Sequence, residues 1–257
     1  DSLSAGSITN NNAANNGGAV YQNAGTINFS GGTITGNGAA ENGGGIYLMG
    51  SSSTISHNKI TESSCDELGG AVFVKGNKNT LNDNTFNKNT GNDSGSIYLE
   101  GNNTKIYSNE IQYNTANNRA GAILIRGTNN KINNNQLNHN TAKSSAGTIY
   151  AEGENTTITE NTITNTTAQD NGGALYILGT NNNINKNTIT QATSTKLGGA
   201  IFLKGNNNNI NNNKLNKNTA NDGGSIYAEG NNNNLKQNTI TKNTANNRAG
   251  AIFIRGN

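Results

Sequence analysis

The stretch GGAIFLKG, at residues 198–205, recurs ten times along this chain in closely related forms. Other copies read GGGIYLMG from Gly43, SGSIYLEG from Ser94 and AGAIFIRG from Ala249. The second position of each copy is always glycine, at Gly18, Gly44, Gly70, Gly95, Gly121, Gly147, Gly173, Gly199, Gly224 and Gly250. Regular steps of about 26 residues indicate a solenoid, in which each repeat stacks on the next.

The composition is unusual for a globular domain. Only 30% of the residues are hydrophobic, there are 33 Gly and no Pro or Trp, and roughly one residue in five is Asn. Such a chain could be disordered, but its apolar residues fall in fixed columns at the repeat period. The formal net charge of +3 is spread along the chain without a basic run, which argues against binding to nucleic acid or to a membrane surface. The sequence has no run of 18 apolar residues, so we expect no insertion of this segment into a membrane.

Two shorter apolar positions follow each glycine-led motif. After Gly199 they are Ile210 and Leu215, and the next glycine of the column is Gly224. No window shows a sustained 3.6-residue period, so we expect almost no helix. Three short strands per turn, with Gly/Asn-rich corners, predict an all-β fold. The expected architecture is a right-handed parallel β-helix of about ten coils, with the handedness taken from parallel crossovers.

An unbroken column of asparagine stands three residues after the first apolar position of each coil. Because Asn tolerates the left-handed backbone conformation, we expect these residues to form the corners. Identical amides at strand spacing can also hydrogen-bond along the axis, so we interpret the column as a structural ladder. Its members are Asn58, Asn84, Asn109, Asn135, Asn161, Asn187, Asn213 and Asn238.

Strand alternation assigns faces within the glycine-led motif. Two of its columns, represented by Ile97 and Leu99, are aliphatic and should point inward, so the residues between them should point outward. One outward column alternates in charge, as Lys75, Glu100 and Arg126 do. The other is aromatic, and we expect it to be exposed, either as a ladder that holds the coils in register or as a candidate contact face. It contains Tyr47, Phe73, Tyr98, Tyr150, Tyr176, Phe202, Tyr227 and Phe253.

A longer repeat is superimposed on the coils. The segment NTANNRAGAILIRG from Asn114 reappears as NTANNRAGAIFIRG from Asn243. Two coils that are one residue shorter than the others, from Gly70 and from Gly199, recur at the same offset. We therefore expect a single β-helix over 1–257 in which a five-coil block at about 18–146 is duplicated, incompletely, at 147–257. The pattern is cut at both ends, so we read the sequence as part of a longer protein.

Residues suited to catalysis or metal binding are sparse. Cys65, Asp66 and Glu67 form the only compact group, and we interpret it as a solvated turn. His57 and His139 fall in different coils, three apart, which is too far for a metal pair. We find no pair of converging acids of the kind that a polysaccharide-cleaving enzyme needs. The expectation is a protein that is not an enzyme and uses no metal or cofactor.

The combination of G-G-A-[IV]-[YF] motifs with N-T-A corners resembles the adhesin-like β-helix proteins of methanogenic archaea. It also resembles the GGAI and FxxN repeats of chlamydial polymorphic outer membrane proteins, although Phe86–Asn89 is the only FxxN match. The resemblance covers essentially the whole chain. It implies an extracellular rod on the cell surface and supplies no ligand-binding residue.

Three functions fit these observations. The first is a surface adhesin or spacer, whose partner would be a glycan or protein on a neighbouring or host cell. The second is a filament subunit that associates with its own copies end to end. The third is a fragment of a polysaccharide-active enzyme whose acids lie elsewhere. Repeat extension without a cluster of catalytic residues favours the first.

Overall fold

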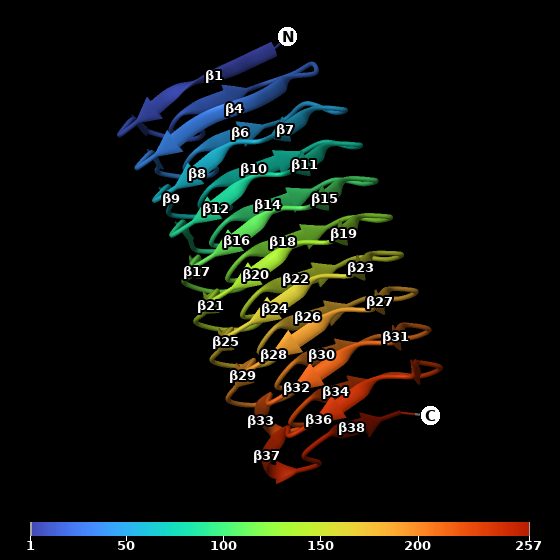
Figure 1. Cartoon of the computed structure of the whole chain (residues 1–257). Coiled ribbons are helices and arrows are strands. Elements are labelled where there is room, and N and C mark those ends of the chain that lie inside the picture. Colours follow the sequence, from blue (N-terminus) through green and yellow to red (C-terminus); the bar gives the residue numbers. More distant parts are fainter. Residues whose placement is uncertain (1, 257) are drawn as a thin grey trace.

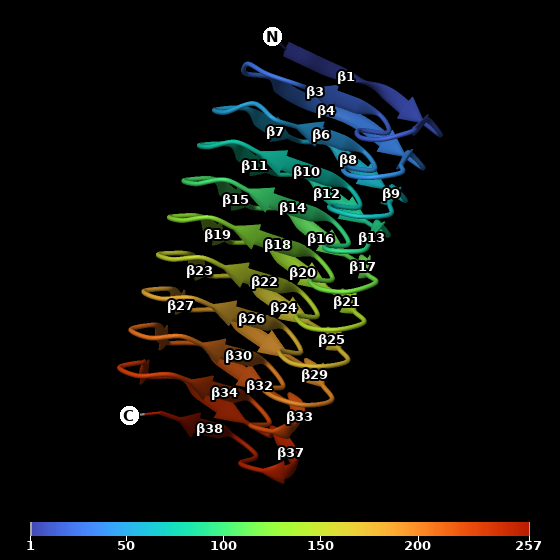
Figure 2. The same ribbon diagram turned by 180° about the vertical axis from the view of Figure 1, so that it is seen from behind.

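The structure, a computed structural model, describes residues 2–256, and within them it contains strands and no helix. Figure 1 shows a stack of coils that descends from the N-terminus at one end to the C-terminus at the other. The view from behind shows the same stack without any segment that departs from it (Figure 2). The strands form three sheets, and every pairing is parallel between one coil and the next, as a parallel β-helix requires.

The glycine-led motif forms one sheet of ten strands, which we call the glycine-led sheet. Its register pairs equivalent residues of successive coils, for example Ile97 with Ile123 and Tyr98 with Leu124. The strands are β3 (Val20–Gln22), β6 (Ile46–Leu48), β10 (Val72–Lys75), β14 (Ile97–Glu100), β18 (Ile123–Arg126), β22 (Ile149–Glu152), β26 (Leu175–Leu178), β30 (Ile201–Lys204), β34 (Ile226–Glu229) and β38 (Ile252–Arg255).

The two shorter apolar positions lie in one 18-stranded sheet, the wide sheet, instead of two separate sheets. In the first two coils a single strand carries both positions, in β1 (Ser2–Thr9) and β4 (Asn28–Thr35). Later coils each have two strands here. The first of them is β7 (Thr54–Ser56), β11 (Thr80–Asn82), β15 (Lys105–Tyr107), β19 (Lys131–Asn133), β23 (Thr157–Thr159), β27 (Asn183–Asn185), β31 (Asn209–Asn211) and β35 (Asn234–Lys236). The second is β8 (Lys59–Thr61), β12 (Thr85–Asn87), β16 (Glu110–Gln112), β20 (Gln136–Asn138), β24 (Thr162–Thr164), β28 (Thr188–Thr190), β32 (Lys214–Asn216) and β36 (Thr239–Thr241).

The third sheet, the narrow sheet, comes from a short Thr-Ala segment that sequence analysis did not single out. Its inward residue is mostly alanine, as in Ala116 and Ala142, so the segment carries little hydrophobic signal. Its strands are β2 (Asn12–Ala13), β5 (Gly38–Ala39), β9 (Ser64–Cys65), β13 (Thr90–Gly91), β17 (Thr115–Ala116), β21 (Thr141–Ala142), β25 (Thr167–Ala168), β29 (Thr193–Ser194), β33 (Thr219–Asp222) and β37 (Thr244–Arg248).

The interior is one continuous aliphatic core along the axis, as strand alternation predicts. A typical coil supplies Ile123 and Ile125 from the glycine-led sheet and Ile132 and Leu137 from the wide sheet, all fully buried. Parallel pairing stacks each of these positions on its equivalent in the next coil. The hydrophobic effect therefore acts between coils as well as within them.

The corners differ from the expectation in one respect. None of the ladder asparagines has a positive φ; the left-handed residue is the one immediately before each of them. The prediction that the ladder Asn itself turns the corner is therefore wrong, because its side chain has to point between the coils. The left-handed residues, which are mostly exposed, are His57, Asp83, Ser108, Asn134, Glu160, Lys186, Asn212 and Gln237.

The two shorter coils lose their residue at the corner between the narrow and glycine-led sheets. Leu68 pairs with Asp93 there, and Leu197 pairs with Asp222 in the same way five coils later. The shortened corner draws each aspartate inward, so that Asp93 is 8% exposed and Asp222 is 3% exposed. A buried carboxylate needs a partner, and each finds an arginine in the following coil.

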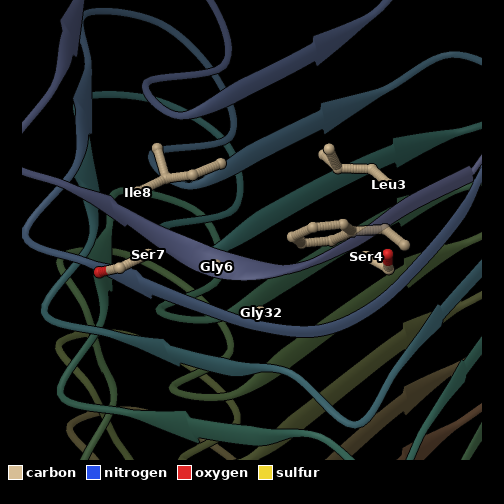
Figure 3. Close-up of a pocket in the computed structure, with 7 residues that line it drawn as sticks. Leu3, Ser4, Gly6, Ser7, Ile8 and Gly32 are labelled. Carbon is tan, nitrogen blue, oxygen red and sulfur yellow. The ribbon is translucent and has the colours of Figure 1, made fainter.

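The ladder ends near the N-terminus, where Gly32 and Gly6 occupy the equivalent positions. Gly32 N–H donates to the Asn58 side chain at 2.8 Å, and the Phe29 ring takes up the space that a side chain at Gly32 would need. A cavity of about 110 Å³ remains beneath β1, lined by residues that include Leu3, Ile8 and Phe29. Figure 3 shows Leu3 and Ile8 beside the ribbon at Gly6.

Candidate functional site

The asparagine column is a structural ladder, as predicted. Each amide nitrogen donates to the side-chain oxygen of the asparagine in the next coil, at 2.9–3.1 Å along the whole column. The same oxygen also accepts from the backbone N–H of the preceding ladder residue, as Asn135 does from Asn109 at 2.9 Å. The buried amides therefore bond to protein groups on both sides and are not available to a ligand.

Two further ladders were missed by sequence analysis. One lies three residues after the second apolar position and includes Asn89, Asn114 and Asn140, joined by side-chain bonds of 3.0 Å. The other lies two residues before the first apolar position and includes Asn208 and Asn233, joined at 3.1 Å. Ser, Thr or Ala interrupts both columns in some coils, which hides them in the sequence. Their constant offset from the apolar positions is the signal that could have revealed them.

The aromatic column points away from the aliphatic core, but it is not the exposed stripe that alternation led us to expect. Tyr98 is 1% exposed, and Phe73, Phe202 and Tyr227 are each 4% exposed. Tyr150 is also buried, and Tyr47, Tyr176 and Phe253 are partly buried. Tyr21, which stacks on Tyr47 at the N-terminal end of the column, is 53% exposed. The expectation of an exposed apolar stripe is therefore wrong for most of the column.

Residues from the corners and from the charged column cover the aromatic rings. Ala120, Ala146 and Leu68 pack against them from the corner that precedes the glycine-led strand. Arg119 lies over the ring of Tyr150 at 5.1 Å, and Arg126 donates to the Tyr98 hydroxyl at 2.8 Å. This cover comes from neighbouring coils, so it cannot be deduced from alternation within one strand.

Within the column the rings stack on one another. Tyr150 and Tyr176 have centroids 4.7 Å apart, and the Tyr227 and Phe253 centroids are 4.9 Å apart with planes within 3°. Such pairs add about 0.5–1.5 kcal/mol beyond their burial. Leu124 interrupts the series between Tyr98 and Tyr150. The arrangement holds adjacent coils in register.

The charged column pairs as its alternating signs predict. Lys75 lies 3.3 Å from Glu100, Arg126 lies 3.1 Å from Glu152, and Lys204 lies 3.9 Å from Glu229. All three pairs are largely exposed and contribute little each. The pairs at the shortened corners have buried carboxylates: Arg119 lies 2.5 Å from Asp93, and Arg248, itself exposed, lies 2.8 Å from Asp222. Arg248 holds the pKa of Asp222 below its usual range.

The acidic corner after β9 is a solvated turn, as predicted, with Asp66 and Glu67 both exposed. Cys65 points the other way, into the core, and its burial raises the pKa of the thiol to about 12. A thiol that stays protonated at neutral pH is a poor nucleophile. His57 and His139 are exposed in different coils, and His139 stacks on Tyr113 with ring centroids 4.7 Å apart.

Burial of Tyr176 gives a testable dependence on pH. Desolvation, followed by the effect of Tyr150 nearby, raises the pKa of Tyr176 to about 12. The pKa in the unfolded chain is about 10. This contribution to stability is therefore complete below pH ~10 and is lost as pH rises toward ~12. Tyr176→Phe should make urea unfolding less sensitive to pH across that range. The same loss of stability in both proteins would contradict the assignment.

One outward-facing group was missed by sequence analysis. Lys105 and Lys131 are aligned neighbours on β15 and β19 of the wide sheet, and both are exposed. With Tyr107, Asn133 and Thr80 they line an open depression of about 400 Å³. When the coils are aligned on their apolar columns, the two lysines fall at the same position. The sequence does not show whether an acidic side chain lies close enough to pair with them.

Residues 2–256 contain no cluster suited to a metal ion and no candidate membrane-spanning helix. No group of three or more His, Cys, Asp or Glu side chains is placed to hold a metal ion. No helix in that part of the chain has the length and apolar character to cross a membrane.

Comparison with known proteins agrees with the coil geometry. The family model for the right-handed β-helix region matches residues 3–163 and again residues 95–257. No curated protein matches the chain, and no solved structure does. The two matches overlap and together span nearly the whole sequence. The chain therefore belongs to the right-handed β-helix family.

Proposed function

We propose that the chain is a non-catalytic extracellular rod on a cell surface, which acts as an adhesin or as the spacer that carries one. The observation that best supports this function is the recurrence of whole surface features. The Asp93–Arg119 pair recurs as Asp222–Arg248, and Lys75–Glu100 recurs as Lys204–Glu229, each at the equivalent place five coils further along. Repetition lengthens a rod and multiplies its contact sites, whereas a catalytic centre gains nothing obvious from it.

The outer face of the wide sheet supports a contact role better than the aromatic column does. Its outward residues are mainly Thr and Asn, as in β23, β24 and β31, with Lys, Gln and Tyr at some positions, as in β15 and β20. Hydroxyl and amide groups at strand spacing offer donors and acceptors to a polar partner such as a glycan. The aromatic column, being covered, serves to hold the coils in register.

The test uses intact cells of the source organism. Antibodies raised against the folded chain should label intact, non-permeabilised cells, and protease added outside the cells should remove the labelling. Labelling that requires permeabilised cells would contradict the proposal. In parallel, the purified chain should release no reducing ends or unsaturated products from acidic or neutral polysaccharides. Release that persists through purification would instead indicate an enzyme.

A further inference from the structure

Lys105 and Lys131 form a like-charged pair in a rod whose other charged neighbours mostly alternate in sign. They occupy equivalent positions of adjacent coils, and Thr80 and Thr157 flank them on either side. Strands in a sheet are separated by about 4.8 Å, and like charges directly opposite one another are destabilising. The glycine-led sheet avoids this cost by placing Glu100 beside Lys75 and Glu152 beside Arg126.

No acidic residue within 2–256 neutralises the pair. Neither ammonium group takes part in any of the ion pairs found there. Asp83 and Glu110 lie on the neighbouring coil and strand, but each is engaged locally. Asp83 accepts a bond from Asn82 at 2.5 Å, and Glu110 accepts one from Gln112 at 2.8 Å. Both carboxylates stay charged, but neither forms an ion pair with the lysines, so the two ammonium groups form a small patch with no direct counter-charge among residues 2–256.

Two more side chains complete the patch. Tyr107 and Asn133 each follow a lysine by two residues, so they share its outward face, and they line the same depression of about 400 Å³. In the described part of the chain neither the Tyr107 hydroxyl nor the Asn133 amide makes a hydrogen bond. Residues at equivalent positions in other coils are engaged: Asn82 bonds to Asp83, and Asn211 accepts from the Lys236 N–H at 2.9 Å.

We propose that this patch binds an acidic saccharide, namely a pyranose unit that carries a carboxylate or sulfate group. The acid group would lie between the two ammonium groups, the sugar ring would lie against Tyr107, and Asn133 would bond to ring hydroxyls. Binding therefore needs both an acid group for the lysines and a sugar ring for Tyr107. A free inorganic anion has no ring, so it should not bind in the same way. The proposal rests on the contact role proposed above and names the chemistry of one partner.

The experiment measures binding of soluble oligosaccharides to the whole chain by calorimetry. The probes are an oligogalacturonate, a sulfated oligosaccharide of similar length and a neutral oligosaccharide, with acetate and sulfate as small-anion controls. We expect one of the two acidic probes to bind at least tenfold more tightly than the neutral one, and which one binds identifies the acid group. Affinity should also fall with added salt, because exposed charges are screened.

Variants test the assigned residues. The double variant Lys105→Gln/Lys131→Gln should weaken binding about tenfold, since it removes two exposed charge contacts, and Tyr107→Ala should weaken it similarly. The matched control is Lys214→Gln, because Lys214 is exposed on the wide sheet between Thr188 and Thr239. The control should bind within twofold of the original chain. The double variant should melt no lower than that chain, since it loses only a repulsion.

Three outcomes overturn the site. These are equal affinity in the double variant, acetate or sulfate binding as tightly as the acidic oligosaccharide, and no binding of either acidic probe. The antibody labelling described above does not depend on these side chains. Labelling of intact cells without saccharide binding would remove the site and keep the surface role, whereas saccharide binding by a chain found inside cells would do the reverse.

Discussion

Replacing Asn135 by leucine should lower the free energy of unfolding by about 3–6 kcal/mol. Asn135 is completely buried in the middle of the ladder. Its amide nitrogen donates to Ile106 O at 3.0 Å and to Asn161 Oδ1 at 2.9 Å, and its oxygen accepts from the Asn109 backbone N–H at 2.9 Å. Leucine removes these three bonds, so the Asn109 N–H loses its acceptor and Ile106 O loses a donor, while Asn161 Oδ1 keeps only the backbone N–H of residue 135 at 3.0 Å. Each buried polar group left unsatisfied costs about 1–3 kcal/mol.

Urea unfolding followed by far-ultraviolet circular dichroism measures this loss. The matched control is Asn165→Gly, because Asn165 is an exposed corner residue with φ of 54° and its side chain makes no hydrogen bond in the described chain. Glycine adopts that conformation readily, so the control should unfold close to the original midpoint. Equal midpoints for the two variants would show that the ladder amides do not hold the coils together.

The second large effect is expected at Gly173, the second glycine of its motif. A Cβ added there would lie 2.1 Å from Gly199 O and 2.6 Å from the Thr193 backbone. Both obstacles are backbone atoms of the next coil, so the two coils would have to separate locally. We expect Gly173→Ala to destabilise the chain by more than ~4 kcal/mol, in the range that marks a specific structural conflict, and to lower the melting temperature accordingly.

The neighbouring Gly172 supplies the control. It has a positive φ of 68°, but equivalent positions hold Ala120 and Ala146, with φ of 60° and 61°. A Cβ at Gly172 would lie 2.4 Å from Leu175 O, so alanine needs a local shift within its own turn, of the kind that the coils with Ala120 and Ala146 accommodate. The left-handed conformation itself costs about 1–2 kcal/mol. Gly172→Ala should lower the melting temperature much less than Gly173→Ala. The reverse order would show that left-handed geometry, and not the close approach of coils, requires glycine in this motif.

The coil period, the inward columns and the principal ladder could be predicted from sequence because each recurs at a fixed spacing. Ile123 and Ile125 are inward in the structure for the reason that alternation gives. The alternating charges of Lys75 and Glu100 likewise predicted their pairing. These features depend on local geometry and on the stacking of identical positions, and both can be read by aligning the repeats.

Contacts that arise between corners could not be predicted in this way. Tyr98 was expected to be exposed, but Arg126 of the next coil and the corner at Ala120 cover it. The burial of Asp93 depends on how the shortened corner turns its side chain, which the spacing of the columns does not show. The Lys105–Lys131 patch depends on whether acidic side chains lie close to the two lysines. Only the positions of the side chains in the structure show this.

The recurrence of the Asp93–Arg119 pair as Asp222–Arg248 also bears on how the rod could change length during evolution. The two pairs are five coils apart, or about 24 Å at strand spacing. Unequal recombination between the two similar halves of the coding sequence would add or remove one whole five-coil block in frame, and each new junction would match one that already exists. Rods produced in this way would differ in length by multiples of about 24 Å. Every contact between coils in the new rod would already exist in the old one, so selection would not have to produce a new interface.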